Sequence, residues 1–194
     1  MPPDAVACRA ILAELVAMAS PLRRTRKAYG PGAVRDGLER FVTCRLQPKA
    51  LGAGGDAVED KVLAAQLATL SFVTPAHVGV DPSLCVGIRW RAAHTALQRA
   101  TAYSCPLDIM RCAAAACAHL SHVLEQHNAA FVPFAALCVL SARPPMLYSH
   151  LEYANRFVHA EQLWDQQLGG GLSIVRAAVQ WVAIQDPSTL SVSS

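Results

Sequence analysis

The chain of 194 residues is short of charge and of aromatic side chains. Charged residues make up 16% of it and aromatic residues 6%, whereas hydrophobic residues make up 53%. So high an apolar fraction excludes a wholly disordered chain. Scarce aromatics beside abundant alanine favour packed helices over a β-sandwich. The length allows one domain with a substantial core and is too short for two ordinary ones.

The sequence also lacks an apolar run long enough to cross a membrane. Its longest stretch without Asp, Glu, Lys or Arg extends from Gln126 to Ala142, which is shorter than the roughly 20 residues that a membrane-spanning helix needs. The apolar start is interrupted by Arg9 and Glu14, so it does not resemble a signal peptide. We therefore expect a soluble, cytoplasmic protein.

Cysteine pairs of the CxxC kind are absent as well. The seven cysteines are odd in number and scattered, which indicates a reducing compartment rather than a disulfide framework. One cluster invites a test for metal binding and consists of Cys112, Cys117, His119 and His122. On a helix Cys117 projects away from Cys112 and His119, so at most three ligands converge where zinc needs four. We expect no metal ion and no cofactor.

The common catalytic signatures are missing too. The chain has no G-x-G-x-x-G, P-loop, H-E-x-x-H or G-x-S-x-G motif and no pair of carboxylates in an apolar setting. Glycines 169–171 precede a predicted helix, where backbone amides can bind an anion. A turn between helices is the commoner use of such glycines. The sequence therefore predicts no covalent catalysis.

Positive charge is concentrated at the start of the chain. Residues 1–49 hold nine Lys and Arg against four Asp and Glu, whereas the remainder holds eight against ten. A formal net charge of +3 is too small to indicate a nucleic-acid partner. One basic run has two interpretations, a peripheral contact with acidic membrane or an acidic partner, and a solvated helix end. It consists of Arg23, Arg24, Arg26 and Lys27.

Hydrophobic periodicity predicts helices along the whole chain. Their expected ranges are 5–19, 34–46, 57–72, 84–103, 106–124, 131–142, 146–158 and 172–184. We expect breaks at Gly30-Pro31-Gly32 and at Pro48, and a capped helix start at Thr74-Pro75. The helix 131–142 is apolar all round, which is typical of the centre of a layered all-α bundle.

The region around that central helix carries a run of motifs. Pro133 lies near its start and Pro144-Pro145 ends it, and a helical segment follows with five fixed positions: Leu147, Ser149, Leu151, Tyr153 and Phe157. Proline at both ends and this spacing resemble the VPS9 domain, the helical module of exchange factors for Rab5-subfamily GTPases. His150 stands where that family usually has asparagine. Independently of the family, Leu147, Leu151 and Ala154 share one helix face, and Tyr153 and Phe157 are spaced to pair.

Other segments resemble further VPS9 motifs in the same order. They are residues 38–41, which resemble the helix before the domain, 70–75, 106–112, and 177–182 in the closing helix. The resemblance divides the chain into an N-terminal helical and basic segment (1–37), a VPS9-like helical domain (38–186) and a loose polar tail (187–194). It implies an all-α layered bundle of the VPS9 type.

The resemblance implies guanine-nucleotide exchange on Rab5-subfamily GTPases in endocytic trafficking, with a cytoplasmic location that extends to endosome surfaces. In the family, exchange uses an aspartate four residues before the helix proline, a tyrosine after a loop glycine, and a threonine three residues later. By position these fall on Ala129, Gly170 and Ser173, with Phe131 and Pro133 as apolar docking residues. The carboxylate and the phenol are therefore missing.

Three interpretations remain open from the sequence. The chain is an attenuated exchange factor, a catalytically silent Rab-binding or scaffolding domain, or a helical scaffold without a GTPase partner. Glu125, Trp164 and Asp165 are nearby groups that would have to replace the missing ones. If the chain binds a Rab, the proline-bearing end of the central helix should reach the surface in a shallow groove, while the rest of that helix is buried.

Overall fold

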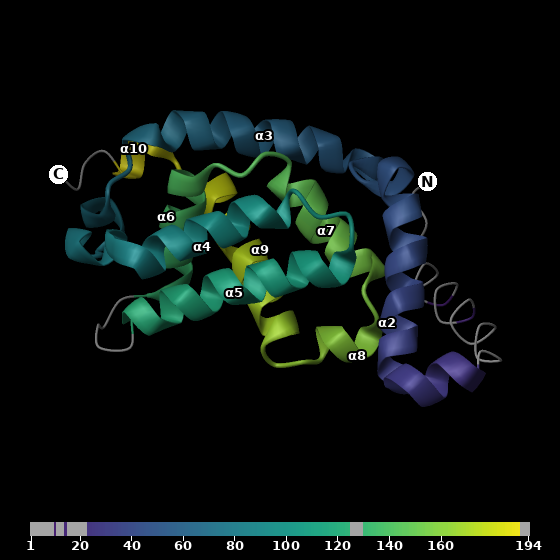
Figure 1. Cartoon of the computed structure of the whole chain (residues 1–194). Coiled ribbons are helices and arrows are strands. Elements are labelled where there is room, and N and C mark those ends of the chain that lie inside the picture. The colour runs from purple at the N-terminus through teal and green to yellow at the C-terminus, as the bar shows by residue number, and fades with distance from the viewer. Residues whose placement is uncertain (1–9, 11–13, 15–22, 125–129, 191–194) are drawn as a thin grey trace.

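The computed structural model describes residues 10, 14, 23–124 and 130–190 of the chain. Throughout these residues the backbone forms helices and connecting turns, and no strand (Figure 1). The all-α fold class predicted from composition and periodicity is confirmed. None of the helices within these ranges is long and apolar enough to span a lipid bilayer.

The elements follow one another with short connections. The α-helices are α2 (Arg23–Ala50), α3 (Asp56–Thr69), α4 (Gly87–Ala100), α5 (Pro106–Leu124), α6 (Phe131–Ala142), α7 (Leu147–Phe157), α8 (Ala160–Leu163), α9 (Leu168–Ile184) and α10 (Pro187–Leu190). The 3-10 helices are η1 (Ala53–Gly55), η2 (Leu70–Phe72), η3 (Pro75–Val78) and η4 (Pro82–Cys85).

The helices are arranged in layers (Figure 1). α4 and α5 lie side by side and antiparallel, and α6, α7 and α9 lie behind them. α3 runs along one edge of this body and α2 along one end. The most extensive helix contacts join α4 to α5, α5 to α9 and α6 to α9. The predicted layered bundle is confirmed.

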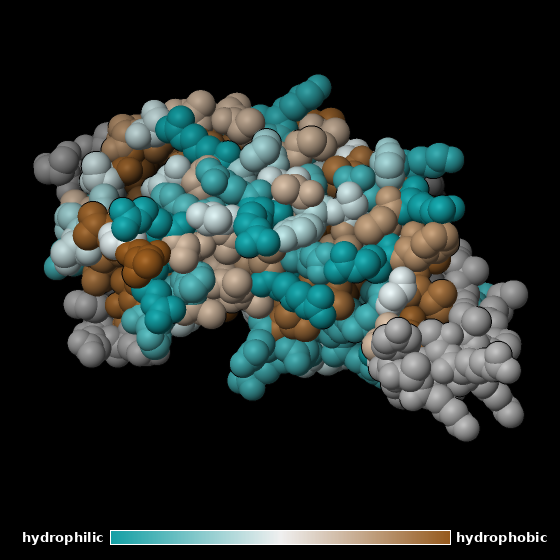
Figure 2. All heavy atoms as spheres, in the orientation of Figure 1, coloured by the Kyte–Doolittle hydropathy of each residue, from teal (hydrophilic) through white to brown (hydrophobic). Residues whose placement is uncertain are grey.

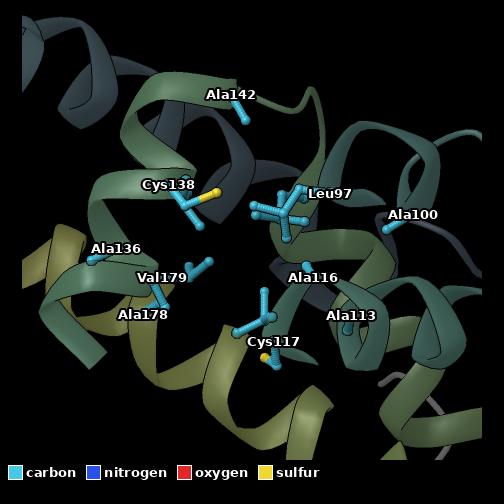
Figure 3. Packing of buried hydrophobic residues seen from close by; sticks show 14 of the residues in the cluster. Leu97, Ala100, Ala113, Ala116, Cys117, Ala136, Cys138, Ala142, Ala178 and Val179 are labelled. Atoms are coloured by element: carbon cyan, nitrogen blue, oxygen red, sulfur yellow. The ribbon is translucent and has the colours of Figure 1, made fainter. Parts of the chain in front are cut away.

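The inward faces of α4 and α5 are the ones that their sequences predict. The stripe on α4 is buried throughout and consists of Trp90, Ala93, Leu97 and Ala100. The stripe on α5 is buried as well and consists of Met110, Ala113, Cys117, Leu120 and Leu124. Figure 3 shows Leu97 and Cys117 in one cluster with Cys138 of α6 and Val179 of α9. Because all four helices bury apolar side chains here, this cluster is the main source of hydrophobic stabilisation.

α6 is the buried spine of the bundle, as its sequence predicts. Eight of its twelve residues are buried and it carries no charged side chain. It ends at Arg143, whose φ of 45° is left-handed and breaks the helical path, and Pro144-Pro145 prevents its resumption. The helix contacts α4 on one side and α9 on the other. A helix enclosed in this way gains little from polar side chains, which explains its uniform composition.

α2 departs from the sequence expectation. It is a single helix through Pro31 and Pro48, where we expected helix boundaries, and across residues 37 and 38, although its axis bends sharply near its N-terminal end (Figure 1). A proline has a helical φ and removes only one hydrogen bond. Pro48 lies in the last turn with its ring exposed, so the missing bond weakens a helix end that already frays. Most of the helix predicted at 5–19 lies outside the described residues, and the domain division at residue 37 stays a prediction.

The remaining helix boundaries follow the sequence more closely. α3 continues through η2 to Phe72, and Thr74 caps η3 with its N–H donating to His77 Nδ1 at 3.0 Å. α4 begins later than predicted because η4 occupies residues 82–85. The start of the polar tail forms one helical turn, α10, whose Leu190 packs partly against the core. The last four residues, 191–194, lie outside the described residues.

Candidate functional site

The proline-bearing end of α6 is where the buried spine reaches the surface. Phe131, Val132 and Pro133 are half-buried, whereas the seven residues from Phe134 to Leu140 are buried. Pro133 is the third residue of the helix, so its missing N–H falls among first-turn amides that have no intrahelical partner. The expectation that this end is accessible while the rest of the helix is covered is confirmed.

The shallow groove expected at this end stays a prediction. One cavity of the described chain lies between α4 and α5, and another lies beside Pro144 and Pro145 at the opposite end of α6. Neither is lined by Phe131 or Pro133. Phe131 packs in part against the hydrophobic core.

Within the described residues, no acidic side chain caps the start of α6. Ala129 and Glu125 lie outside the described residues, and the N-cap Ala130 makes no side-chain hydrogen bond. The first turn closes through the N–H of Phe134, which donates to the carbonyl of Ala130 at 3.3 Å. The partial positive charge of this helix N-terminus is therefore not offset by the cap residue.

The three glycines before the predicted last helix lie inside that helix, so our interpretation of them as a turn is wrong. α9 begins at Leu168. A Cβ on Gly169 would lie 1.9 Å from the carbonyl oxygen of Leu163, and one on Gly171 would lie 2.5 Å from the Cα of Ala114. Both contacts are impossible for real atoms. Glycine is needed because α8 and α5 approach the backbone of α9 too closely for a side chain.

Gly170 differs from its two neighbours because it faces open space. A Cβ there would meet no heavy atom within 4 Å. Ser173 follows three residues later on the same helix and is exposed, so the two share one face of α9. α9 also packs against α6. The helices that carry the predicted site residues Phe131, Pro133, Gly170 and Ser173 are thus brought together, whereas Ala129 cannot be assigned a place.

The loop before α9 holds the two groups considered as replacements for the missing ones. The carboxylate of Asp165 accepts hydrogen bonds from the N–H groups of Gln167 and Leu168 at 2.9 and 2.8 Å. It therefore caps α9 and occupies the amides that would hold an anion. Trp164 has no such structural role, and 87% of its surface is exposed. It is the most exposed of the large hydrophobic side chains in the described ranges.

The family-like segment after the double proline forms α7, which anchors its neighbours. The Tyr153 hydroxyl donates to the carbonyl of Thr43 in α2 at 2.6 Å. Burial raises the pKa of Tyr153, so this hydroxyl stays a donor. The ring of Phe157 lies 4.9 Å from that of Tyr153, as the spacing predicts. Leu151 and the other apolar residues on this face are buried, so these motif positions hold the fold together.

Two further anchors join α7 to α3. Asp60 accepts hydrogen bonds from both the backbone N–H and the hydroxyl of Ser149. Asp56 is paired with both guanidinium nitrogens of Arg156, at 2.5 and 2.7 Å. The Asp56 side chain is 5% exposed and the Arg156 side chain 21%, so this ion pair is largely shielded from water.

A third anchor joins the loop after α7 to α2. Glu39 is buried and accepts a hydrogen bond from the backbone N–H of His159 at 3.0 Å. Burial raises the pKa of Glu39, the neighbouring Asp36 adds to the rise, and the bond from His159 and the charge of Arg35 oppose it. Sequence reasoning missed Glu39, Asp56 and Asp60. The signal available was a pair of acids one turn apart at the start of α3.

The cysteine and histidine cluster is divided between two environments. Cys112 and His119 line the cavity between α4 and α5. Cys117 faces α9 instead, with its sulfur 3.5 Å from the carbonyl of Gly171, which confirms the direction expected for it. Burial raises the pKa of Cys117 to about 12, so this thiol is not a nucleophile. Within the described residues no three metal-ligating side chains converge.

The basic run falls in the first turns of α2. Arg23, Arg24, Arg26 and Lys27 are helical, and their side chains lie outside what the structure describes. The two interpretations of this run, a membrane contact and a solvated helix end, stay predictions.

Comparison with known proteins identifies the family. The model of the vacuolar sorting protein 9 (VPS9) domain matches residues 90–186, which is half of the chain. The chain is 25% identical over 177 residues to the vacuolar protein sorting-associated protein vps901 of Schizosaccharomyces pombe, covering 82% of this chain and 31% of that protein. It is 24% identical over 140 residues to vacuolar protein sorting-associated protein 9A of Arabidopsis thaliana, covering 66% of this chain and 27% of that protein.

The match begins at Trp90 in α4 and ends at Asp186, after α9. It therefore includes the buried spine, α7 and both helix ends described above, whereas the partners of the α7 anchors on α2 and α3 precede it. The chain spans less than a third of the length of each of these relatives. The extent of the family match, the order of its motifs and the layered helical fold agree: the chain belongs to the VPS9 domain family.

Proposed function

We propose that this chain engages Rab5-subfamily small GTPases through the starts of α6 and α9, and that its guanine-nucleotide exchange activity is weak. The observation that carries the proposal is the accessible, proline-bearing first turn of an otherwise buried helix. A surface element held by a rigid core loses little conformational freedom on binding. Membership of the VPS9 family supports the class of partner.

Apolar contacts are the part of such a surface that this chain retains. Phe131 and Pro133 are partly accessible on α6, and Trp164 projects into solvent shortly before α9. Tryptophan is enriched among the residues that dominate binding energy in protein interfaces. We infer that Trp164 contributes an apolar anchor to the GTPase contact, in place of the phenol that the family resemblance implies at Gly170.

Weak exchange follows from the groups that are absent. An exchange factor must bind the nucleotide-free GTPase better than the loaded one, because only a difference in affinity releases GDP. A carboxylate achieves this by competing for the lysine and Mg²⁺ that hold the phosphates. Alanine at position 129 cannot do so. A charge pair at 4 Å is worth about 4 kcal/mol at an effective dielectric of 20, which corresponds to about three decades in rate.

A silent Rab-binding domain is the second candidate function. The capping role of Asp165 favours it, because both hydrogen bonds of that carboxylate hold the start of α9. A carboxylate committed to the helix cap is not free to displace phosphate. The names of the relatives concern vacuolar protein sorting, and either candidate fits a cytoplasmic protein that acts at the surface of endosomes.

Release of a fluorescent GDP analogue from Rab5-subfamily GTPases tests the proposal. We expect the chain to be captured by immobilised nucleotide-free GTPase and to accelerate release only slightly. Capture without any acceleration would establish the silent binder. Absence of both capture and acceleration would contradict the proposal.

Two variants test whether the scaffold is competent. Ala129→Asp restores the carboxylate, and Gly170→Tyr adds a phenol at the position with open space. We expect the double variant to accelerate release at least tenfold, about 1.4 kcal/mol of the barrier. The matched control is Ala65→Asp, because Ala65 is an exposed residue of α3. Equal rates for the control and the double variant would argue against an intact exchange surface.

A further inference from the structure

The groove between α4 and α5 is a second feature of the surface, separate from the starts of α6 and α9. It has a volume of about 570 Å³ and is lined by residues of both helices, with Arg40 of α2 at one end. Its lining includes three small side chains, Ala92 and Ala96 from α4 and Ala115 from α5. Figure 2 shows this face of the molecule, where hydrophilic side chains lie over α4 and α5.

Positive charge exceeds negative charge in this groove. Three arginines line it, Arg40, Arg99 and Arg111, and Asp108 is the single carboxylate among the lining residues. Asp108 is paired with Arg40 at 2.6 Å and with Arg111 at 3.3 Å. One carboxylate cannot neutralise two guanidinium groups, so this cluster keeps a positive charge even before Arg99 is counted.

Arg99 adds a charge that no described acid offsets. Its guanidinium donates to the hydroxyl of Tyr103 at 2.6 Å and lies 5.7 Å from the centre of that ring. The tyrosine positions the guanidinium but carries no charge. A fourth arginine stands near the opposite end of the groove, where Arg89 lies 3.5 Å from His119 Nδ1.

The groove has the length of a short extended peptide. Its lining on α5 extends from Asp108 to His119, and eleven residues of helix rise about 16 Å. An extended chain advances about 3.3 Å per residue, so about five residues would fill it. Arg40 and Arg111 lie at the Asp108 end of the groove, with Arg99 nearby, and Arg89 lies at the His119 end. Positive charge at both ends suits several carboxylates along a chain better than one phosphate group.

We propose that the groove between α4 and α5 binds an acidic, extended segment of a partner protein. The guanidinium groups would pair with its carboxylates, as Arg40 and Arg111 already pair with that of Asp108, and the small alanines of the lining would leave room for its backbone. The site is independent of GTPase binding, because it depends on α4, α5 and Arg40 and not on the starts of α6 and α9.

Fluorescence polarisation with a labelled pentaglutamate peptide tests the proposal on the whole chain without any GTPase. We expect binding that weakens as salt is added, because the contacts are exposed and screened. A labelled pentaglutamine peptide should not bind. Binding of pentaglutamine as tightly as pentaglutamate would contradict the proposal, and so would failure of pentaglutamate to bind at low salt.

Charge reversal locates the binding. The double variant Arg99→Glu with Arg111→Glu should weaken pentaglutamate binding at least tenfold, because it replaces attraction by repulsion in the groove. The matched control, Lys49→Glu with Lys61→Glu, changes the net charge equally at exposed positions of α2 and α3 and should weaken it far less. Equal losses in both would mean that the peptide senses only net charge.

Two further measurements test whether a loss of binding comes from misfolding and whether the groove binds lipid instead of a peptide. Arg99→Gln removes one charge whose described partner is neutral, so it should fold normally and weaken pentaglutamate binding about threefold, as the loss of one exposed charge contact predicts. Vesicles of phosphatidylcholine with phosphatidylserine serve as the second ligand. If the chain binds these vesicles through Arg99 and Arg111 but does not bind pentaglutamate, the site recognises lipid and the peptide proposal is wrong.

Discussion

α7 and the starts of α6 and α9 are built in opposite ways. α7 is tied to α2 and α3 by three polar anchors, through Tyr153, Ser149 and Arg156. The starts of α6 and α9 present an uncapped alanine, an open glycine and an exposed serine. The motif positions in α7 therefore secure the architecture, whereas the positions that we propose for the GTPase contact carry small side chains.

Under this proposal, family membership and exchange activity depend on separate residues. Changing an anchor of α7 leaves a buried polar group without its partner, which costs more than the hydrogen bond itself contributes. Changing Gly170 or Ser173 leaves no buried group unsatisfied in the structure described. A chain can lose exchange activity at such positions and keep its fold, which is the combination that we propose here.

The largest effect is expected at the start of α9, where the neighbouring glycines Gly170 and Gly171 differ in their surroundings. Gly171→Ala places a methyl group against the backbone of Ala114, and we expect it to lower the free energy of unfolding by about 3 kcal/mol through overpacking. Gly170→Ala is the matched control, since its methyl group meets open space and alanine favours helix by about 1 kcal/mol. Urea denaturation followed by circular dichroism measures both. Equal destabilisation would show that the two positions are not distinct.

Removing the ion pair that joins α3 to α7 should have the next largest effect. Asp56→Ala leaves Arg156 partly buried without its bidentate partner, and we expect a loss of about 2 kcal/mol, below the range for a fully buried pair. The control is Glu161→Ala, which removes an exposed partner of Arg35 and should change stability little. If both variants unfold at the same urea concentration, the ion pair of Asp56 with Arg156 stabilises the fold no more than the exposed ion pair of Arg35 with Glu161.

A smaller effect is expected at the anchor between α7 and α2. Tyr153→Phe removes one buried hydrogen bond to Thr43 while the ring stays in place, so a loss of about 1 kcal/mol is expected. Tyr148→Phe is the control, because Tyr148 is half-buried and its hydroxyl has no described partner. Thermal melts of the two variants measure the difference, and identical melting temperatures would remove Tyr153 from the set of anchors.

Most of the fold could be predicted because the spacing of apolar residues indicates which face of each helix is buried. The limits of α6 are those that the sequence predicts, since an apolar run with a stop at Pro144-Pro145 admits one interpretation. The helix boundaries predicted at Pro31 and Pro48 were wrong because a proline's φ is compatible with helix. Gly169 and Gly171 were misread because the backbones that approach them come from α8 and α5.

Only those features of the site that depend on the local sequence could be predicted. That Pro133 begins a buried helix follows from local sequence. That Asp60 holds Ser149 and that Asp56 holds Arg156 depends on pairs about 90 to 100 residues apart, which periodicity cannot reveal. The same holds for the charged groove between α4 and α5, where Arg40 arrives from another helix.

The smallest effect expected is a pH dependence at Glu39. Burial raises its pKa above the ordinary 4.5, so the folded state holds this proton more tightly than the unfolded state. Stability from this group is therefore greatest in acid and falls as the pH rises through the raised pKa. Glu39→Gln keeps an oxygen that can accept the His159 N–H but does not titrate, so its urea stability should fall less than that of the wild type between mildly acidic and neutral pH. A steeper fall in the variant would mean that the charged form of Glu39 stabilises α2, and this anchor would then resemble the ion pair of Asp56 with Arg156.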